Sequence, residues 1–339
     1  MYPWSRELEG RWESHEIESE ALRDNPLGDP YKRPLYVYLP PSYDTSVESY
    51  PVIYVLQGMT GQVDMWWNRS AFRPTTPEAI DKLFSDPDVP DTIVVLLDAW
   101  TSYGGSQYLN SKGTGRYLDY VVQDVVGYVD GNFRTVPDAA KRAVTGKSSG
   151  GYGAMVLPML RPGIFGALST HAGDAAFEWC YQGDLAQSAR SLLENYNGSF
   201  DEFWADFRGR PAFTKPWDPV LLNVYAMAAC YSTDDDGTVR IPFDARSGLI
   251  DDDVWSRWLM LDPVRMARSH VEELRSLKGI WIDAGRSDEY YLDVGARCFS
   301  AVLSSVGVTH RLELFNGRHG SIEYRYPIAI KYLAEVLHT

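Results

Sequence analysis

The chain has 339 residues, of which 45% are hydrophobic and 23% are charged, and its formal net charge is −14. This composition is typical of a soluble globular protein with a large apolar core. The acidic balance argues against nucleic acids and anionic membranes as partners, because both are bound through clustered Lys and Arg side chains.

Cysteines and the N-terminus narrow the class of protein further. Cys180, Cys230 and Cys298 match neither a zinc pattern nor a disulfide framework. The start MYPWSRELEG lacks the basic and apolar regions of a signal peptide. No apolar run approaches the roughly 20 residues that a membrane span needs. We therefore expect a cytoplasmic protein, and the sequence leaves a homo-oligomer open.

Apolar runs rich in β-branched residues alternate along the chain with segments that have helical spacing. We predict strands at 35–39, 51–57, 92–99, 142–147, 166–171, 278–284 and 309–315, and helices at 76–84, 117–131, 151–160, 292–305 and 321–337. Most of the strand runs are continuous, as in strands buried on both faces. The alternation predicts one α/β domain over 1–339, with a mostly parallel sheet covered by helices.

One interval, 174–262, has no strand-like run and is rich in aromatic and acidic residues. A stretch of this length between two strands is usually an insertion with helices of its own. We expect a helical lid inserted into the α/β domain, because the strand pattern resumes after it.

The stretch RAVTGKSSGGYGAM, residues 142–155, contains two overlapping motifs. Gly146-Lys147-Ser148 is the end of a phosphate-binding loop, but that loop needs a glycine at the position of Lys141. Gly146-Lys147-Ser148-Ser149-Gly150 is also the frame of a nucleophile elbow, where small residues let a strand and a helix approach closely. Because a predicted strand leads in and a predicted helix leads out, we interpret Ser148 as a nucleophile.

A nucleophilic serine needs a base that removes its proton. In α/β chains with this elbow, the acid and then the histidine follow the serine along the chain. His319 lies in the loop directly after the last predicted strand, whereas His338 sits at the C-terminus, so His319 is the predicted base. His171 ends a strand beside the elbow and remains an alternative, although a role in the pocket wall or in packing suits its position better.

The acid that orients the base is expected after the strand at 278–284, in DAGRSDEYYLD. Asp288 lies in the loop at the carboxyl edge of the sheet, where open α/β folds bind ligands. It is the predicted acid, and the alternatives are Asp283, Glu289 and Asp293. Two amides would stabilise the negative oxygen that forms during attack: that of Ser149 and that of Met59, which Gly58 makes accessible.

Five segments together resemble the putative-esterase family of α/β-hydrolases: YLPPSYD, PVIYVLQG, NFRTVPDAAKRAVTGKSSGGYGAM, DAGRSDEYYLD and NGRHGSIEYRYP. This family includes esterase D (S-formylglutathione hydrolase), feruloyl, acetylxylan and enterochelin esterases, and the antigen 85 mycolyltransferases. The resemblance runs from residue 35 to the C-terminus apart from 174–262 and is nearest to the enterochelin-esterase-like branch. It implies an α/β-hydrolase fold, with Ser148, Asp288 and His319 at the positions of the family's serine, acid and histidine.

Two residues depart from the family pattern. Gln57 precedes the oxyanion glycine, where many relatives have His, and its amide can hold the loop by hydrogen bonds. Lys147 stands beside the nucleophile, where relatives commonly have a neutral residue or His. It is either a solvated neighbour or a group that favours an anionic part of the substrate.

These residues predict a serine hydrolase that cleaves small-molecule carboxylic esters through an acyl-enzyme, without a metal or an organic cofactor. Acyl transfer to an alcohol or amine is a rival within enzymes, and a non-catalytic binding protein on the same fold is a rival from another class. Trp66 and Trp67 follow the oxyanion loop directly, and further aromatic residues fall in the insertion. Aromatic faces at a site suit aryl or bulky acyl groups, although tryptophans also pack cores.

Overall fold

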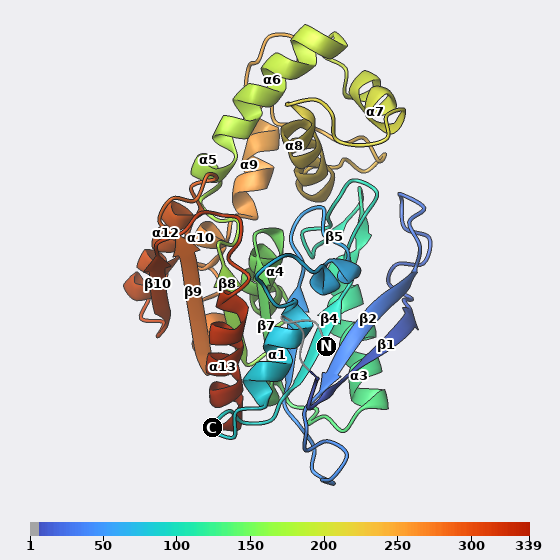
Figure 1. Ribbon diagram of the computed structural model, residues 1–339. Coiled ribbons are helices and arrows are strands. Elements are labelled where there is room, and N and C mark those ends of the chain that lie inside the picture. Colours follow the sequence, from blue (N-terminus) through green and yellow to red (C-terminus); the bar gives the residue numbers. More distant parts are fainter. Residues whose placement is uncertain (1–6) are drawn as a thin grey trace.

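The computed structural model describes residues 7–339 and is built around an eight-stranded sheet (Figure 1). The strand order across the sheet is β1-β2-β4-β3-β7-β8-β9-β10. The strands are β1 (Arg11–Glu18), β2 (Lys32–Leu39), β3 (Val52–Leu56), β4 (Ile93–Leu97), β7 (Arg142–Lys147), β8 (Ala167–His171), β9 (Gly279–Gly285) and β10 (Arg311–Phe315). A separate two-stranded ribbon consists of β5 (Asn110–Ser111) and β6 (Gly115–Arg116).

Most of the sheet is parallel. β1 pairs with β2 and β2 with β4 in antiparallel fashion, and every later pair in the sheet is parallel. All residues of β3 and β4 are buried, which explains why their sequences are continuous apolar runs. The predicted α/β architecture is confirmed.

Helices cover both faces of the sheet (Figure 1). Residues of α1 and α13 pack on one face, and residues of η2, α3, α4 and α12 pack on the other. The bounds are η1 (Val63–Trp67), α1 (Thr76–Phe84), α2 (Tyr117–Asp119), η2 (Tyr120–Val125), α3 (Val126–Asn132), η3 (Ala139–Lys141), α4 (Ser149–Leu160), α10 (Pro263–Met266), α11 (Val271–Arg275), α12 (Leu292–Ser305) and α13 (Arg325–His338).

The insertion leaves the sheet after β8, the sixth of its strands in chain order, and it is helical as predicted. Its helices are α5 (Phe177–Cys180), α6 (Gln182–Tyr196), α7 (Phe200–Arg208), α8 (Asp218–Tyr231) and α9 (Asp252–Met260). Figure 1 shows α6, α7 and α8 above the carboxyl ends of the parallel strands. The insertion therefore lies over the edge of the sheet where ligands bind in such folds.

The structure differs from the predicted elements mainly at the N-terminus. The edge strand β1 was not predicted, because its sequence RWESHEIE alternates charged with less polar residues and contains no apolar run. It pairs with β2 along eight residues, so tertiary pairing overrides a weak local signal. The last helix begins at Arg325 rather than at 321.

Candidate active site

Ser148 lies on the sharp turn between β7 and α4. Its backbone has φ 58° and ψ −125°, a conformation that side-chain-bearing residues rarely adopt. The Ser148 amide donates to the carbonyl oxygens of His171 (3.0 Å) and Ala172 (3.1 Å), and the Ser148 carbonyl accepts from the Tyr152 amide (2.8 Å). These bonds hold the serine at the carboxyl edge of the sheet, as in a nucleophile elbow.

Two glycines let the strand and the helix meet at this turn. A side-chain carbon on Gly146 would lie 2.4 Å from the carbonyl of Gly150. A side-chain carbon on Gly150 would lie 2.3 Å from the carbonyl oxygen of Leu56 in β3. The glycine frame therefore follows from close backbone packing on both sides of Ser148.

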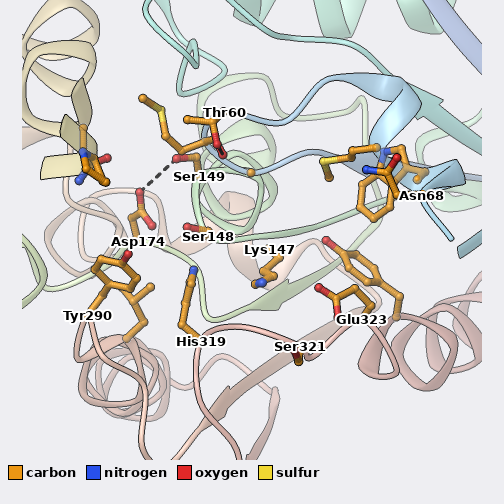
Figure 2. Close-up of a pocket in the computed structure, with 18 of the residues that line it drawn as sticks. Thr60, Asn68, Lys147, Ser148, Ser149, Asp174, Tyr290, His319, Ser321 and Glu323 are labelled. Atoms are coloured by element: carbon orange, nitrogen blue, oxygen red, sulfur yellow. Dashed lines mark hydrogen bonds between the residues drawn. The ribbon is translucent and has the colours of Figure 1, made fainter. Parts of the chain in front are cut away.

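His319 and Asp288 come together beside Ser148. Asp288 Oδ2 lies 2.9 Å from His319 Nδ1, and its Oδ1 accepts from the Tyr290 amide at 2.9 Å. The Asp288 side chain is fully buried and that of His319 is 15% exposed. Figure 2 shows the His319 ring directed toward Ser148. The carboxylate thus fixes the ring so that Nε2 faces the serine.

The alternative acids lie in other environments. Asp283 pairs with His171 at 2.7 Å, and both side chains are almost completely buried. Glu289 is 40% exposed, pairs with Arg318 and accepts from the His319 amide. Asp293 lies in the first turn of α12 and pairs with Arg297 at 3.2 Å. Of the four candidates, the structure brings Asp288 to the His319 ring nitrogen.

The loop after β3 lies against the serine. A side-chain carbon on Gly58 would lie 3.6 Å from Cβ of Ser148. Gln57 Nε2 donates to the Gly61 carbonyl at 2.5 Å, which ties the two ends of the loop together. Within residues 7–339, neither the Met59 amide nor the Ser149 amide donates to a protein acceptor. Both amides are thus free to bind an oxygen atom.

A pocket of about 1040 Å³ surrounds these residues. Its lining includes Gly58, Met59, Trp66, Lys147, Ser148, Ser149 and His319 among the predicted site residues. The insertion contributes a wall with residues such as Tyr181, Phe213 and Leu222. The pocket thus lies between the sheet edge and the insertion.

Three predicted pocket residues lie elsewhere. Trp67 packs on the rings of Trp12 and Tyr36 outside the pocket, because the short helix η1 directs Trp66 inward and Trp67 outward. His171 is fully buried beneath the pocket, and its ring packs against that of Tyr326. Gln57 is buried behind the loop that it holds, so it supports the loop without lining the pocket.

Asp174 is a pocket residue that was not predicted. It is buried and accepts from Gln107 (3.1 Å), Tyr181 (3.0 Å) and, at 3.5 Å, the Ser149 hydroxyl (Figure 2). Burial raises the pKa of its carboxyl above the ordinary value. It follows β8 as Asp288 follows β9, so the rule that ligands bind at the carboxyl ends of parallel strands could have identified it.

Residues 30–325 match the family model described as "Putative esterase". The chain belongs to the putative esterase family. A similar protein, an esterase of Mycobacterium tuberculosis strain H37Rv, is 29% identical over 144 residues, which cover 41% of the chain and 29% of that protein. The chain therefore spans less than a third of that relative's length.

Solved structures share the fold of this putative esterase across nearly its whole length. A ferulic acid esterase has a TM-score of 0.62 and 17% identity, with 98% of this chain and 100% of that chain covered. An S-formylglutathione hydrolase from Agrobacterium tumefaciens has a TM-score of 0.60 and 17% identity, with 98% of each chain covered. At this level of identity the likeness establishes the α/β-hydrolase fold.

Residues 7–339 contain no cluster of three or more His, Cys, Asp or Glu side chains that could hold a metal ion. None of their helices has the length and apolar character needed to span a membrane.

Proposed function

We propose that this putative esterase hydrolyses carboxylic esters through an acyl-enzyme, with Ser148 as nucleophile, His319 as general base and Asp288 as the group that orients the base. The observation that carries the proposal is the 2.9 Å contact between Asp288 and His319 Nδ1, with the ring directed toward a serine held in an elbow. A serine, a base and an orienting acid in this geometry form the apparatus of acyl transfer.

The steps follow from these positions. The Ser148 hydroxyl attacks the ester carbonyl carbon while His319 takes its proton at Nε2. The amides of Met59 and Ser149 bind the resulting negative oxygen. The bond to the alcohol then breaks, and His319 returns the proton to the leaving oxygen. Water, deprotonated by His319, attacks the acyl-enzyme and releases the acid and free Ser148.

No hydrogen bond joins Ser148 to the His319 side chain in the part of the chain that the structure describes. Such contacts are often long before substrate binds and tighten in the complex. We propose that substrate binding closes this contact.

Labelling with a fluorophosphonate tests the proposal, because the reagent reacts with activated serines. We expect a single adduct, mapped by mass spectrometry to Ser148, and no adduct in Ser148→Ala. Hydrolysis of 4-nitrophenyl acetate should disappear with the same substitution. An adduct at another residue, or unreactive protein, contradicts the proposed role of Ser148.

We further propose that aryl or bulky acyl esters are preferred. Aromatic rings on several sides of the pocket support this choice: Trp66, Tyr181, Phe213, Tyr290, Tyr324 and Tyr326. Such rings bury flat groups with little loss of side-chain entropy. A ferulic acid esterase with the same fold is named for an aromatic acid, in keeping with this preference.

Trp66 and Trp67 provide a matched test of the aryl preference. Trp66→Leu removes a ring from the pocket and should lower the ratio of aryl to acetyl ester kcat/KM about tenfold, or roughly 1.4 kcal/mol. Trp67→Leu is the control, because its ring contacts Trp12 and Tyr36 outside the pocket. Equal ratios in both variants and the wild type would show that the rings do not select the substrate.

A further inference from the structure

Lys147 is the last residue of β7 and directly precedes Ser148. Its side chain lines the pocket and is half-buried. Figure 2 shows Lys147 and Glu323 on one side of Ser148, and Asp174 and Tyr290 on the other. The lysine therefore lines the pocket next to the proposed nucleophile.

The Lys147 amine has no partner among residues 7–339: it forms neither an ion pair nor a hydrogen bond. Glu323, Asp288 and Glu289 influence it electrostatically without contact. Each of these carboxylates already has another partner. Glu323 pairs with Arg73 (3.4 Å), Asp288 with His319 (2.9 Å) and Glu289 with Arg318 (2.5 Å).

A half-buried ammonium group without a partner is costly. Burial lowers the pKa of Lys147, which reflects the loss of water around the charged form, and the three carboxylates offset this only in part. An anion in contact with the amine would compensate the lost hydration more fully than a neutral oxygen can. The surroundings of the Lys147 amine therefore favour the binding of an anionic ligand.

The rest of the pocket would direct an anion to Lys147. Asn68, Ser70 and Ser321 line the pocket and can donate hydrogen bonds to a carboxylate. On the insertion side, the pocket is lined by the carboxyl groups of Asp174 and Asp184. Their hydrogen-bond partners are neutral groups, and no Lys or Arg pairs with either among the described residues. These carboxyl groups offer an anion no cation to pair with, whereas Lys147 does.

We propose that Lys147 binds a carboxylate carried by the substrate, so that the enzyme prefers esters with an anionic group close to the scissile bond. This inference rests on the proposed esterase function of the same site. It assigns Lys147 to substrate selection and gives it no part in the chemical steps.

Two matched pairs of esters test the inference, because the charge can lie on either arm. In the first, 4-nitrophenyl hydrogen glutarate is compared with 4-nitrophenyl valerate; in the second, 4-acetoxybenzoate is compared with 4-acetoxybenzamide. The readout is the charged-to-neutral ratio of kcat/KM within each pair. In Lys147→Met and Lys147→Gln, the ratio should fall about tenfold or more for at least one pair. The use of two neutral variants guards against a folding defect in one.

Two control variants isolate the role of the charge in the pocket. Lys147→Arg keeps the charge and should hold the ratio within about threefold of the wild type. Lys331→Met removes a charge from the exposed surface of α13, where Lys331 is 42% exposed, and should leave both ratios unchanged. If the neutral Lys147 variants change both members of each pair equally, the proposed carboxylate site is wrong.

A binding measurement separates this inference from the proposed function. The four esters are titrated by calorimetry into Ser148→Ala, with and without Lys147→Met. Selective binding of the charged esters that Lys147→Met removes supports the carboxylate site even if the wild type hydrolyses none of them. Turnover of the neutral esters without any charge selectivity supports the esterase and overturns the site.

Discussion

The contact between Asp288 and His319 separates the predicted acid from the three carboxylates that the sequence left as alternatives. Asp288 is buried, is oriented by the Tyr290 amide and faces His319 Nδ1. Glu289 is adjacent in the chain, but its side chain contacts Arg318 and the main chain of His319. Asp288 and Glu289 are adjacent in the chain, so both lie close to His319. They differ in the direction of their side chains, because only that of Asp288 contacts the His319 ring.

We predict that Asp288→Asn lowers kcat by about 10³-fold or more while the protein stays folded, because an amide can stabilise the wrong imidazole tautomer. Steady-state kinetics on 4-nitrophenyl acetate, with circular dichroism as the folding check, measures this effect. Glu289→Gln is the matched control and should cost less than about tenfold, because its carboxylate does not contact the ring. A larger loss in Glu289→Gln than in Asp288→Asn would reverse the assignment.

Gln57 shows how a residue that departs from the family pattern can keep a loop in place. Its side-chain amide donates to Gly61, and its carbonyl oxygen accepts from the Tyr108 hydroxyl at 2.6 Å. The loop that carries Met59 is therefore braced from both the side chain and the backbone of Gln57. The Gln57 amide thus holds the loop by a hydrogen bond, as its position in the sequence suggested.

At the scale of the elements, a buried charge network joins three parts of the fold that carry the site. Asp283 in β9 contacts His171 in β8, and its other oxygen accepts from Arg325 at the start of α13 at 3.0 Å. The Ser148 amide is held by the carbonyl of His171, and α13 follows the His319 loop. The network thus links the strands and the helix around Ser148, Asp288 and His319.

We predict that Arg325→Met lowers the free energy of unfolding by about 3 kcal/mol, because it leaves the Asp283 carboxylate buried without its cation. Urea denaturation followed by circular dichroism measures the change. Arg297→Met is the control: Arg297 is 51% exposed in its pair with Asp293, so its loss should cost less than about 1 kcal/mol. Similar losses in the two variants would show that the buried network adds nothing.

The same network predicts a dependence on pH. Burial opposes the charged form of Asp283, but His171, Trp281 and Arg325 outweigh it and hold its pKa below the ordinary value of 3.8. A lowered folded-state pKa stabilises the protein fully above the unfolded-state pKa, and this contribution is lost as the pH falls through the folded-state pKa. Removing Arg325 raises the pKa of Asp283. The midpoint of acid unfolding should therefore move to higher pH in Arg325→Met.

At the scale of the whole molecule, the insertion shares the core of the α/β fold. The ring of Tyr152 in α4 packs against those of Phe177 and Tyr231 in the insertion, with ring centroids 6.0 and 5.9 Å apart, and its hydroxyl donates to the carbonyl of Leu261. Most residues of α8 are buried, whereas in α7 only Phe203 is. The part of the insertion near the sheet is thus a continuation of the core.

We predict that hydrogen exchange divides the insertion in two. Amides of α8 should be protected about as well as those of α4, because opening either helix exposes the shared core. Amides of α7, which packs at the outer side of the insertion, should exchange at least about tenfold faster than those of α8. Exchange followed by mass spectrometry checks this. If α8 exchanges as fast as α7, the insertion opens as a unit separate from the sheet.

Sequence alone predicted the mostly parallel sheet and the elbow around Ser148, and it placed Asp288 and His319 in the loops after the last two strands. These features depend on residues a few positions apart: apolar runs, the Gly146 and Gly150 frame, and loops that follow strands. It also placed the helical insertion, because no strand-like run occurs between β8 and β9.

Only the tertiary structure decided which way the side chains point. Trp66 enters the pocket while Trp67 packs on Trp12 of β1, a strand whose polar sequence gave no signal. His171 is sealed against Tyr326, and Asp174 turns into the site. Local patterns encode how the backbone folds over a few residues, but whether a side chain faces a cavity depends on which distant segment covers it. That information is spread over contacts between residues far apart in the chain.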